Sequence, residues 1–335
     1  MTDESDYTIA FVYETPSSFI IQDLRILSNM FRVVAVQWVG VASIVKVLLA
    51  VLHCDIVFAW WVTGQASTMA FVFAKAFRKK TIFVPGGSEV ALNRDIHGSD
   101  PRSAIRFLLA RIIIRFADCV IPVSEFTLRE VLAISAPKRY RVVYNAIDTH
   151  RYILNHRFRK ELNIVSVAMT RDPRGFRIKG LDRYAKLSKA LPNFSFYLVG
   201  PASADPRVRR LFSPGVCVGL ISQDELLSFY QKAIFYCQLS RYESFGAAVA
   251  EAMACECVPV VSDSGALPEV VGNCGIIVHD GDPLVAARLI RESLPRTGDL
   301  GSLGRKRILS EFNVKKRSFN LQEVILTLIL SKKGK

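Results

Sequence analysis

The chain has 335 residues, of which 50% are hydrophobic and 22% charged, and its formal net charge is +14. This length accommodates two domains of ordinary size, and this composition excludes a disordered or low-complexity chain. The charge excess is uneven: residues 1–150 hold 16 Lys/Arg against 13 Asp/Glu, and residues 151–335 hold 28 against 17. Such a surface attracts phosphorylated ligands, anionic lipid or nucleic acid.

The cysteines and the N-terminus indicate a reducing compartment. The seven cysteines include no C-x-x-C pair and lie mostly in apolar runs, so we expect reduced, packed thiols. The start MTDESDYTIAF lacks the pattern of a signal peptide, which predicts a cytoplasmic protein. Of the two most hydrophobic stretches, residues 41–52 are too short and residues 56–77 are broken by Thr63-Gly64-Gln65, so neither is expected to span a membrane.

In the first half of the chain, short apolar runs alternate with helical patterns. Strands are predicted at Thr8–Tyr13, Arg32–Trp38, Asp55–Trp61, Thr81–Pro85, Asp118–Val123 and Arg141–Tyr144. This alternation is typical of a doubly wound parallel sheet, an α/β architecture.

The alternation restarts after a polar, basic stretch at Asn155–Lys160. Further strands are predicted at Ile164–Met169, Phe194–Val199, Val216–Val218, Ile234–Leu239, Val258–Ser262 and Gly275–Val278. The end of the chain predicts one helix over 313–330, apolar at Phe319, Val324, Ile325, Leu328 and Ile329. We therefore predict two Rossmann-like domains, residues 1–150 and 160–312, followed by a C-terminal helical segment, 313–335, that packs toward the first domain.

Ligands of such sheets bind beyond the carboxyl ends of the strands. The loop after the first strand reads Glu14-Thr15-Pro16-Ser17-Ser18-Phe19 and contains no glycine. A G-x-G-x-x-G fingerprint is missing there and also after Met169. This argues against a nicotinamide- or flavin-dependent dehydrogenase.

The segment from residue 234 to residue 269 carries the most chemistry. Glu243 follows a buried strand and precedes a helix that begins near Phe245-Gly246, where helix capping is its ordinary alternative role. Glu251 lies in the helical sequence AAVAEAMA, where a carboxylate with little free surface needs donors such as sugar hydroxyls. The amides of Phe245, Gly246 and Ala247 would face an anionic group held between the two carboxylates.

The sequence ESFGAAVAEAMACECVPVVSDSGALPE, from Glu243 to Glu269, resembles the signature of the large retaining GT-B glycosyltransferase family with an E-x7-E motif, family 4 of the group 1 type. The resemblance implies a first glutamate near the transferred sugar and a second on the ribose of the donor, which are Glu243 and Glu251. It places the donor against the backbone of Ser244, Phe245, Gly246 and Ala247. It also implies an acceptor-binding N-terminal domain, a donor-binding C-terminal domain and an active site in the cleft between them.

Three other stretches carry the same resemblance. VVYNAID, residues 142–148, resembles the family's domain junction. TRDPRGFRIKGLD, residues 170–182, resembles the loop in which a lysine and an arginine hold the donor diphosphate. Lys179 matches, and the family's usual spacing, five residues before the lysine, selects Arg174 as the second catalytic residue. Because the loop is lengthened, Arg171 and Arg177 compete for that role as donor-binding residues, and a solvated loop charge is the alternative for each arginine. FYLVGP and VGLISQDEL resemble the segments that frame the nucleobase, which implies roles for Gly200 and Leu220.

The first half departs from the family pattern. Many relatives carry a Gly-rich loop after the first strand and a histidine after the fourth, whereas this chain has Pro16-Ser17-Ser18 and Pro85-Gly86-Gly87-Ser88-Glu89. We expect Gly86, Gly87, Ser88 and Glu89 on the acceptor side, with an ordinary turn as the alternative. His97 follows that loop, and a packing or surface role is the usual one for such a residue.

The resemblance implies transfer of a hexosyl group from a UDP- or GDP-sugar to a glycan or lipid-linked acceptor, with retention, in glycan, glycolipid or polysaccharide assembly. It implies no cofactor and no metal, because Lys179, an arginine and helix amides stabilise the departing diphosphate. An epimerase of sugar nucleotides with the same fold is an alternative, although no added acid/base cluster is present. A nucleic-acid-binding protein is a second one, but the arginines are not interleaved with aromatics as in known modules, so nucleic acid is not an expected partner.

Two basic segments predict a role at a membrane surface. Residues 102–116 read RSAIRFLLARIIIRF, with arginines at Arg102, Arg106, Arg111 and Arg115, and residues 301–335 hold nine Lys/Arg against two Glu. A basic helix with a broad apolar face can lie among lipid headgroups. The alternative is that its apolar face packs on the sheet and leaves the arginines solvated. We expect peripheral docking on the cytoplasmic face of an anionic membrane, without a span.

Overall fold

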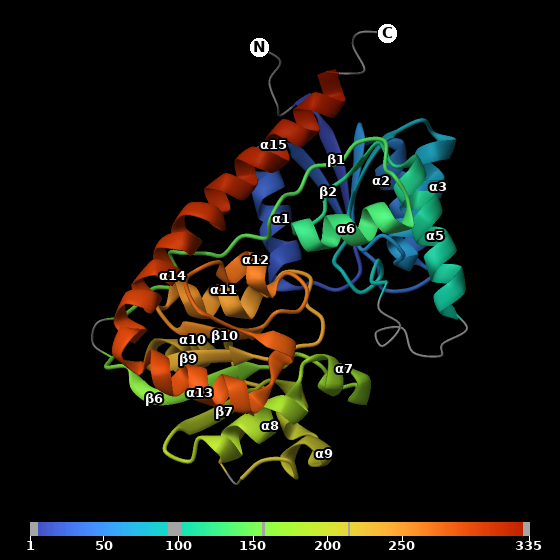
Figure 1. The fold of residues 1–335 in the computed structure, drawn as a ribbon. Coiled ribbons are helices and arrows are strands. Elements are labelled where there is room, and N and C mark those ends of the chain that lie inside the picture. The colour runs from blue at the N-terminus through green and yellow to red at the C-terminus, as the bar shows by residue number, and fades with distance from the viewer. Residues whose placement is uncertain (1–5, 93–101, 156–157, 214, 331–335) are drawn as a thin grey trace. The chain divides into compact units, whose positions relative to one another are not determined.

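The computed structural model describes residues 6–92, 102–155, 158–213 and 215–330. The chain divides into two compact units, one comprising Met1–Asn145 and Lys315–Lys335 and the other Ala146–Val314. The division falls inside VVYNAID and ahead of the basic stretch at Asn155–Lys160. Each unit contains one parallel sheet flanked by helices (Figure 1).

The sheet of the first unit has five parallel strands in the order β2-β1-β3-β4-β5. The strands are β1 (Thr8–Tyr13), β2 (Arg32–Gln37), β3 (Ile56–Trp60), β4 (Lys80–Val84) and β5 (Cys119–Val120). Its helices are α1 (Ser18–Ser28), α2 (Ser43–Leu52), α3 (Gln65–Ala76), α5 (Arg102–Phe116), α6 (Glu125–Ile134) and α15 (Val314–Leu330). The inner strands β1, β3 and β4 are almost wholly buried, as expected for parallel strands covered on both faces.

One predicted strand of this unit is wrong. Residues 141–144 run beside β5, where the amide of Arg141 donates to the Val120 carbonyl at 3.2 Å and that of Val143 to the Pro122 carbonyl at 3.0 Å. Pro122 has no N–H and cannot return a bond, so the ladder ends after an isolated bridge between Val120 and Tyr140. The segment is extended but is not a regular strand.

The C-terminal helix α15 belongs to the first unit, and Arg317 near its start bonds to Asp23 of α1. Figure 1 shows the helix in red. Its buried face consists of Arg317, Leu321, Val324, Ile325, Leu328 and Ile329. Phe319 was predicted to share this face, but it is 59% exposed. The buried positions follow the helical period from residue 317, and position 319 falls on the opposite side.

The sheet of the second unit has six parallel strands in the order β11-β10-β9-β6-β7-β8. They are β6 (Glu161–Val167), β7 (Ser195–Val199), β8 (Cys217–Gly219), β9 (Ala233–Gln238), β10 (Val258–Ser262) and β11 (Ile276–Val278). The helices are α7 (Pro173–Ile178), α8 (Leu181–Ala190), α9 (Pro206–Arg209), α10 (Gln223–Lys232), α11 (Ala247–Ala254), α12 (Leu267–Val271), α13 (Pro283–Ser293) and α14 (Thr297–Glu311). The strand order reverses between β6 and β9, so the loops after these two strands border a crevice at the carboxyl edge.

The seven cysteines are free thiols, and five of them are buried. Within the described part of the chain, no helix combines the length and the apolar character needed to cross a bilayer.

Candidate active site

The reversal between β6 and β9 places a lysine and a glutamate side by side. Lys179 follows α7 in the loop after β6, and Glu243 follows β9. The Lys179 Nζ donates to Oε2 of Glu243 at 2.6 Å, and the two side chains remain 28% and 14% exposed. Gln238, the last residue of β9, donates its Nε2 to the same oxygen at 2.5 Å. A ligand reaching this edge meets a cation and a carboxylate held in fixed positions.

Two glycines allow the loops around this pair to pack closely. Gly265 has φ +66°, and a Cβ there would lie 2.2 Å from the Glu243 carbonyl oxygen. Gly180, next to Lys179, has φ +68°, and a Cβ there would lie 2.0 Å from the Leu239 carbonyl oxygen. Any other residue would force the backbone apart at both places. The positions of Lys179 and Glu243 therefore depend on glycine backbone as well as on their mutual ion pair.

Helix α11 begins beside Glu243. Gly246 precedes the helix with φ +93°, and no side chain caps the helix there. The Phe245 ring is buried and packs edge-on against Phe312, with ring centroids 5.6 Å apart. Ser244 and Ala247 are half-buried on either side of these two residues. The structure thus brings the predicted donor-binding backbone to the first turn of a helix, where amide groups and the helix dipole favour an anion.

Glu251 lies inside α11 and is half-buried. The hydroxyl of Tyr230 donates to its Oε2 at 3.4 Å, and the Tyr152 hydroxyl also bonds to this carboxyl group. Burial raises the pKa of Glu251 to about 7. The two tyrosine hydrogen bonds and the charge of Arg151 lower this pKa, but burial has the larger effect. The carboxyl group therefore changes its charge near neutral pH.

Replacing Glu251 with alanine is expected to weaken donor binding by about 1.5–3 kcal/mol, because hydrogen bonds from ribose hydroxyls to a carboxylate are lost. Calorimetry with a nucleoside diphosphate sugar measures this directly. Since the ionised carboxylate is the stronger acceptor and its pKa is about 7, wild-type affinity should rise by up to about tenfold from about pH 6 to about pH 8.

The Glu251→Gln variant is the control, because the amide does not titrate and its profile should stay flat. The diphosphate of a sugar nucleotide has no ionisation in this window that would mimic the effect. An unchanged affinity in Glu251→Ala would remove this residue from the donor site.

The three candidate arginines lie in different surroundings. Arg171 lines a pocket of about 310 Å³ together with Pro201, Ala204, Asp205 and Leu220. Arg174 pairs instead with Asp172, the residue that caps α7, at 3.5 Å. Arg177 is exposed. The structure thus joins Arg171 to the predicted nucleobase residue Leu220, which follows β8.

Gly200 belongs to the same edge. It follows β7 with φ +113°, and its amide donates to the Gly219 carbonyl at 2.7 Å. A Cβ at Gly200 would lie 2.6 Å from the Ala168 carbonyl oxygen, so the loops after β6, β7 and β8 pack on one another here. Gly200 directly precedes Pro201, which lines the pocket beside Arg171.

The predicted acceptor-side residues belong to the first unit and follow β4. Oε1 of Glu89 accepts from the amide of Gly86 at 2.6 Å and from that of Val62 at 3.4 Å. Gly87 has φ +124°, and Ser88 is exposed. Burial raises the pKa of Glu89, although the hydrogen bonds from surrounding backbone amides lower it. His97 lies outside the described residues.

Sequence reasoning missed four residues of the candidate site: Gln238, Gly265, Tyr152 and Tyr230. Gln238 had a signal, since a polar residue ended an otherwise apolar strand, IFYCQ. The tyrosines had none, because residues 152 and 230 lie far from Glu251 in the chain and meet it only in the fold.

A cluster that could hold a metal ion lies among the described residues of the second unit. It consists of Asp263, His279 and Asp280, with ligand atoms within 4.8 Å of one another, and all three residues are exposed or largely so. The hydrogen bond that the ring donates to Asp263 and the charges of the nearby carboxylates raise the pKa of His279. This pairing alone explains the cluster, and exposed acidic groups of this kind are common without a metal.

Solved structures share the fold of this chain over nearly its whole length. Sucrose-phosphate synthase from Thermosynechococcus elongatus superposes with a TM-score of 0.77 at 16% identity, covering 97% of this chain and 100% of that one. HepE from Anabaena, solved in complex with UDP and glucose, gives a TM-score of 0.78 at 15% identity and covers 96% and 100%. The two parallel-sheet domains thus define a GT-B fold.

Sequence comparison then places the chain in a family. The family model described as glycosyl transferases group 1 matches residues 172–294, and the model described as glycosyltransferase family 4 matches residues 28–151. The chain belongs to these GT-B glycosyltransferases.

One relative in this family is a GDP-mannose:cellobiosyl-diphosphopolyprenol alpha-mannosyltransferase from Xanthomonas campestris. It is 29% identical over 150 residues, which cover 38% of this chain and 36% of the relative. The match thus spans about a third of the relative's own length.

Proposed function

We propose that this protein transfers a hexosyl group from a nucleoside diphosphate sugar to a glycan or lipid-linked acceptor, with retention and without a required metal. The observation that carries the proposal is the pair formed by Lys179 and Glu243 at the β6/β9 reversal, beside the first turn of α11. A cation and helix amides suit a diphosphate, and a neighbouring carboxylate suits the sugar attached to it.

Each group then has a distinct task. Lys179 stabilises the negative charge that grows on the diphosphate as its bond to the sugar breaks. Glu243 faces the transferred sugar, and Glu251 accepts hydrogen bonds from the ribose hydroxyls. In the same-face route that the family resemblance implies, the acceptor oxygen bonds to the anomeric carbon on the side from which the diphosphate leaves. The acceptor's proton passes to the departing phosphate oxygen.

A screen of UDP- and GDP-sugars, GDP-mannose included, tests this proposal by thermal stabilisation and by slow donor hydrolysis followed by NMR. We expect one donor to stabilise the protein and to release a sugar with the donor's anomeric configuration, equally with and without EDTA. An inverted product would contradict retention, and loss of activity in EDTA would contradict metal independence. Epimerised sugar nucleotide in place of free sugar would favour an epimerase of the same fold.

The proposal extends to docking on the cytoplasmic face of an anionic membrane. Helix α3 of the first unit packs against both α2 and α5. These three helices contain no Asp or Glu, whereas they carry Lys46, Lys75 and the four arginines of α5. Lys75 is paired with Asp118, just after α5, at 3.4 Å, so the arginines of α5 and Lys46 carry the attraction. Anionic headgroups attract such cations with about 1 kcal/mol for each one near the surface.

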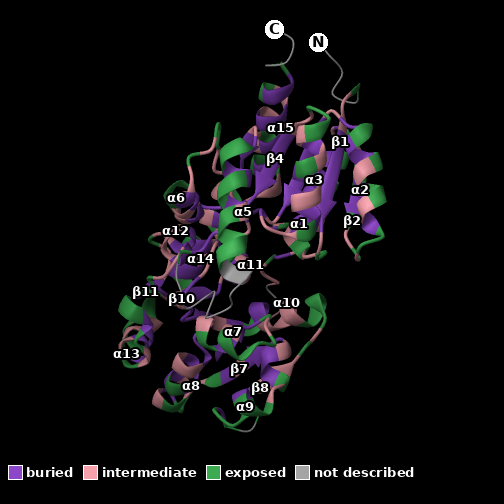
Figure 2. Cartoon of the chain, turned by 90° about the vertical axis from the view of Figure 1, so that its right-hand side faces the viewer, coloured by how far each residue is buried: buried purple, intermediate pink, exposed green. Residues whose placement is uncertain are grey.

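The same layer exposes large apolar side chains. In α5, Ala110, Ile113 and Ile114 are buried, so part of its apolar surface packs inward. The rest faces outward beside exposed Arg106, Arg111 and Arg115 (Figure 2). The apolar residues of this layer that are more than a third exposed are Val45, Leu49, Leu52, Val72, Ile105, Phe107, Leu108, Ile112 and Phe116.

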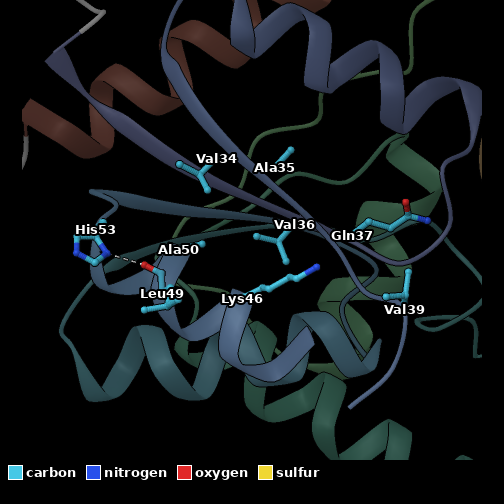
Figure 3. A pocket seen from close by; sticks show the side chains of 9 residues that line it. All are labelled: Val34, Ala35, Val36, Gln37, Val39, Lys46, Leu49, Ala50 and His53. Carbon is cyan, nitrogen blue, oxygen red and sulfur yellow. Dashed lines mark hydrogen bonds between the residues drawn. The ribbon is translucent and has the colours of Figure 1, made fainter. Parts of the chain in front are cut away.

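A groove between β2 and α2 continues this apolar surface. Its volume is about 640 Å³, and the Lys46 side chain extends along it (Figure 3). The groove is lined by Val34, Ala35, Val36, Gln37, Val39, Lys46, Leu49, Ala50 and His53. Apolar side chains with cations among them fit the boundary between acyl chains and headgroups.

Co-sedimentation with vesicles tests the docking. We expect binding to vesicles that contain anionic lipid, but not to neutral ones, and loss of binding in high salt. Replacing Arg106 and Arg111 together with Glu should weaken binding at least tenfold, because two attractive charges become repulsive. Lys189→Glu on α8 of the second unit is the matched control, since Lys189 is also exposed. Absence of binding to anionic vesicles at low salt would refute the docking.

A further inference from the structure

Gln238 is a buried amide in the middle of the second unit's sheet. It ends β9, which lies between β6 and β10, and it is 4% exposed. Parallel strands covered on both faces favour apolar side chains, and a buried amide costs free energy unless its polar atoms have partners. An apolar residue would therefore serve the strand better, so the amide calls for a role beyond packing.

Both ends of the Gln238 amide are engaged. Residues 236 and 238 lie on the same face of β9, because side chains alternate along a strand. The Tyr236 hydroxyl donates to Oε1 of Gln238 at 3.1 Å, and Nε2 of Gln238 donates to Oε2 of Glu243 at 2.5 Å. The opposite orientation of the amide would turn its oxygen toward the carboxylate. The hydroxyl of Tyr236 thus selects the orientation that presents N–H groups to Glu243.

Tyr236 is itself fixed in the core. It is fully buried, and its ring meets the ring of Tyr230 edge-on, with centroids 5.9 Å apart. Burial raises the pKa of Tyr236, so the hydroxyl keeps its proton and remains a donor. A rigid donor therefore lies behind the amide that reaches Glu243.

The two side-chain donors to Glu243 share one oxygen. Lys179 and Gln238 both donate to Oε2, at 2.6 and 2.5 Å. Among the described residues, no side chain donates to Oε1, and the Glu243 side chain is 14% exposed. One oxygen of the carboxylate is thus anchored to the protein, and the other can accept from a ligand.

A bound diphosphate would affect these two donors differently. Lys179 is a cation on a flexible stem, so a diphosphate competes with Glu243 for its ammonium group. Gln238 is neutral and is held from behind by Tyr236, so an anion does not draw it away from the carboxylate. The bond from Gln238 therefore persists when the bond from Lys179 is exchanged.

We infer that Gln238, oriented by Tyr236, is a positioning residue that keeps Glu243 in place when Lys179 turns to the diphosphate. This inference rests on the proposed function, in which Glu243 faces the transferred sugar. It gives the end of β9 a task that is carried out through Glu243, without contact to the substrate.

Gln238→Met tests the role, because methionine has nearly the shape of glutamine but no N–H group. We expect kcat with saturating donor to fall at least tenfold, while the dissociation constants of UDP and GDP stay within about twofold. Gln231→Met is the matched control. Gln231 is also buried in the second unit, and its Nε2 donates to the Ile153 carbonyl at 2.9 Å, so the same kind of bond is lost away from Glu243. Its kcat should stay near that of the wild type.

Two further variants give results that packing alone would not produce. Tyr236→Phe should lower kcat at least threefold in the wild-type background but not in Gln238→Met, because the hydroxyl acts through the amide. Gln238→Glu places a carboxyl group beside Glu243 that donates only when it is protonated. Its kcat relative to the wild type should therefore rise at least tenfold as the pH falls from about 8 to about 5.5.

An unchanged kcat in Gln238→Met, or a loss no larger than that in Gln231→Met, would overturn the positioning role and leave the proposed function standing. Equal effects of Tyr236→Phe in both backgrounds would show that Tyr236 does not orient the amide. If Gln238→Met does not fold, Gln238→Glu and Tyr236→Phe still decide the question. If the wild type turns over no UDP- or GDP-sugar, the proposed function fails and this inference fails with it.

Discussion

Replacing Lys179 with alanine is expected to lower kcat at least a hundredfold with the donor saturating. Its Nζ is held 2.6 Å from Glu243 at the edge where the diphosphate is proposed to lie. Negative charge on the leaving group grows as the bond to the sugar breaks, so a fixed cation stabilises the transition state more than the bound donor. Removing one such preorganised group typically costs a factor of about 10²–10³ in kcat. The donor dissociation constant should change far less.

The measurement compares turnover with saturating donor and calorimetric donor affinity for the same variant. Lys189→Ala is the control, because Lys189 is exposed on α8 and this substitution removes the same charge from the same unit. Glu243→Gln separates two roles for Lys179. If the lysine only positions Glu243, the Gln variant should lose as much activity and adding Lys179→Ala should cost nothing more. A turnover number that survives in Lys179→Ala would remove this residue from the mechanism.

Replacing Arg317 with alanine is expected to destabilise the protein by about 3–5 kcal/mol, because it breaks a buried ion pair. The Arg317 guanidinium bonds both oxygens of Asp23, at 2.5 and 2.7 Å, and the two side chains are 1% and 0% exposed. It also donates to the carbonyls of Val143 and Tyr144 at 2.8 and 2.6 Å. Its removal leaves a buried carboxylate and two carbonyls without their donors, although Trp60 still donates to Asp23.

Chemical unfolding followed by circular dichroism measures the loss, and Lys315→Ala on the same helix is the control, since Lys315 is exposed. The double variant Asp23→Asn/Arg317→Met should lose less than the two single variants together, because neither partner is then left charged and alone. A loss below about 1 kcal/mol in Arg317→Ala, which is typical of a surface ion pair, would mean that water reaches Asp23 in solution.

The sequence by itself determined the fold class and the family. Eleven strands were predicted within a few residues of their observed ends, because parallel strands covered on both faces read as short, continuous apolar runs. The motif from Glu243 to Glu269 carried the family resemblance, which the family models confirm. The twelfth predicted strand, Arg141–Tyr144, was wrong. Its own residues are extended and partly apolar, but they do not show that the neighbouring chain has a proline, Pro122, without the N–H that would continue the ladder. The roles of Glu243, Lys179 and Glu251 remain predictions.

The tertiary structure alone decided which side chains meet. Lys179 and Glu243 are 64 residues apart, and Arg317 and Asp23 are 294 apart, yet each pair is in direct contact. Tyr152 and Tyr230 reach Glu251 from a loop and from a different helix. Such contacts follow from the order of strands in a sheet, since that order selects which loops share an edge. Local residue patterns record burial and helical or extended conformation, but strand order is fixed by packing across the whole domain, so these partners emerged only from the fold.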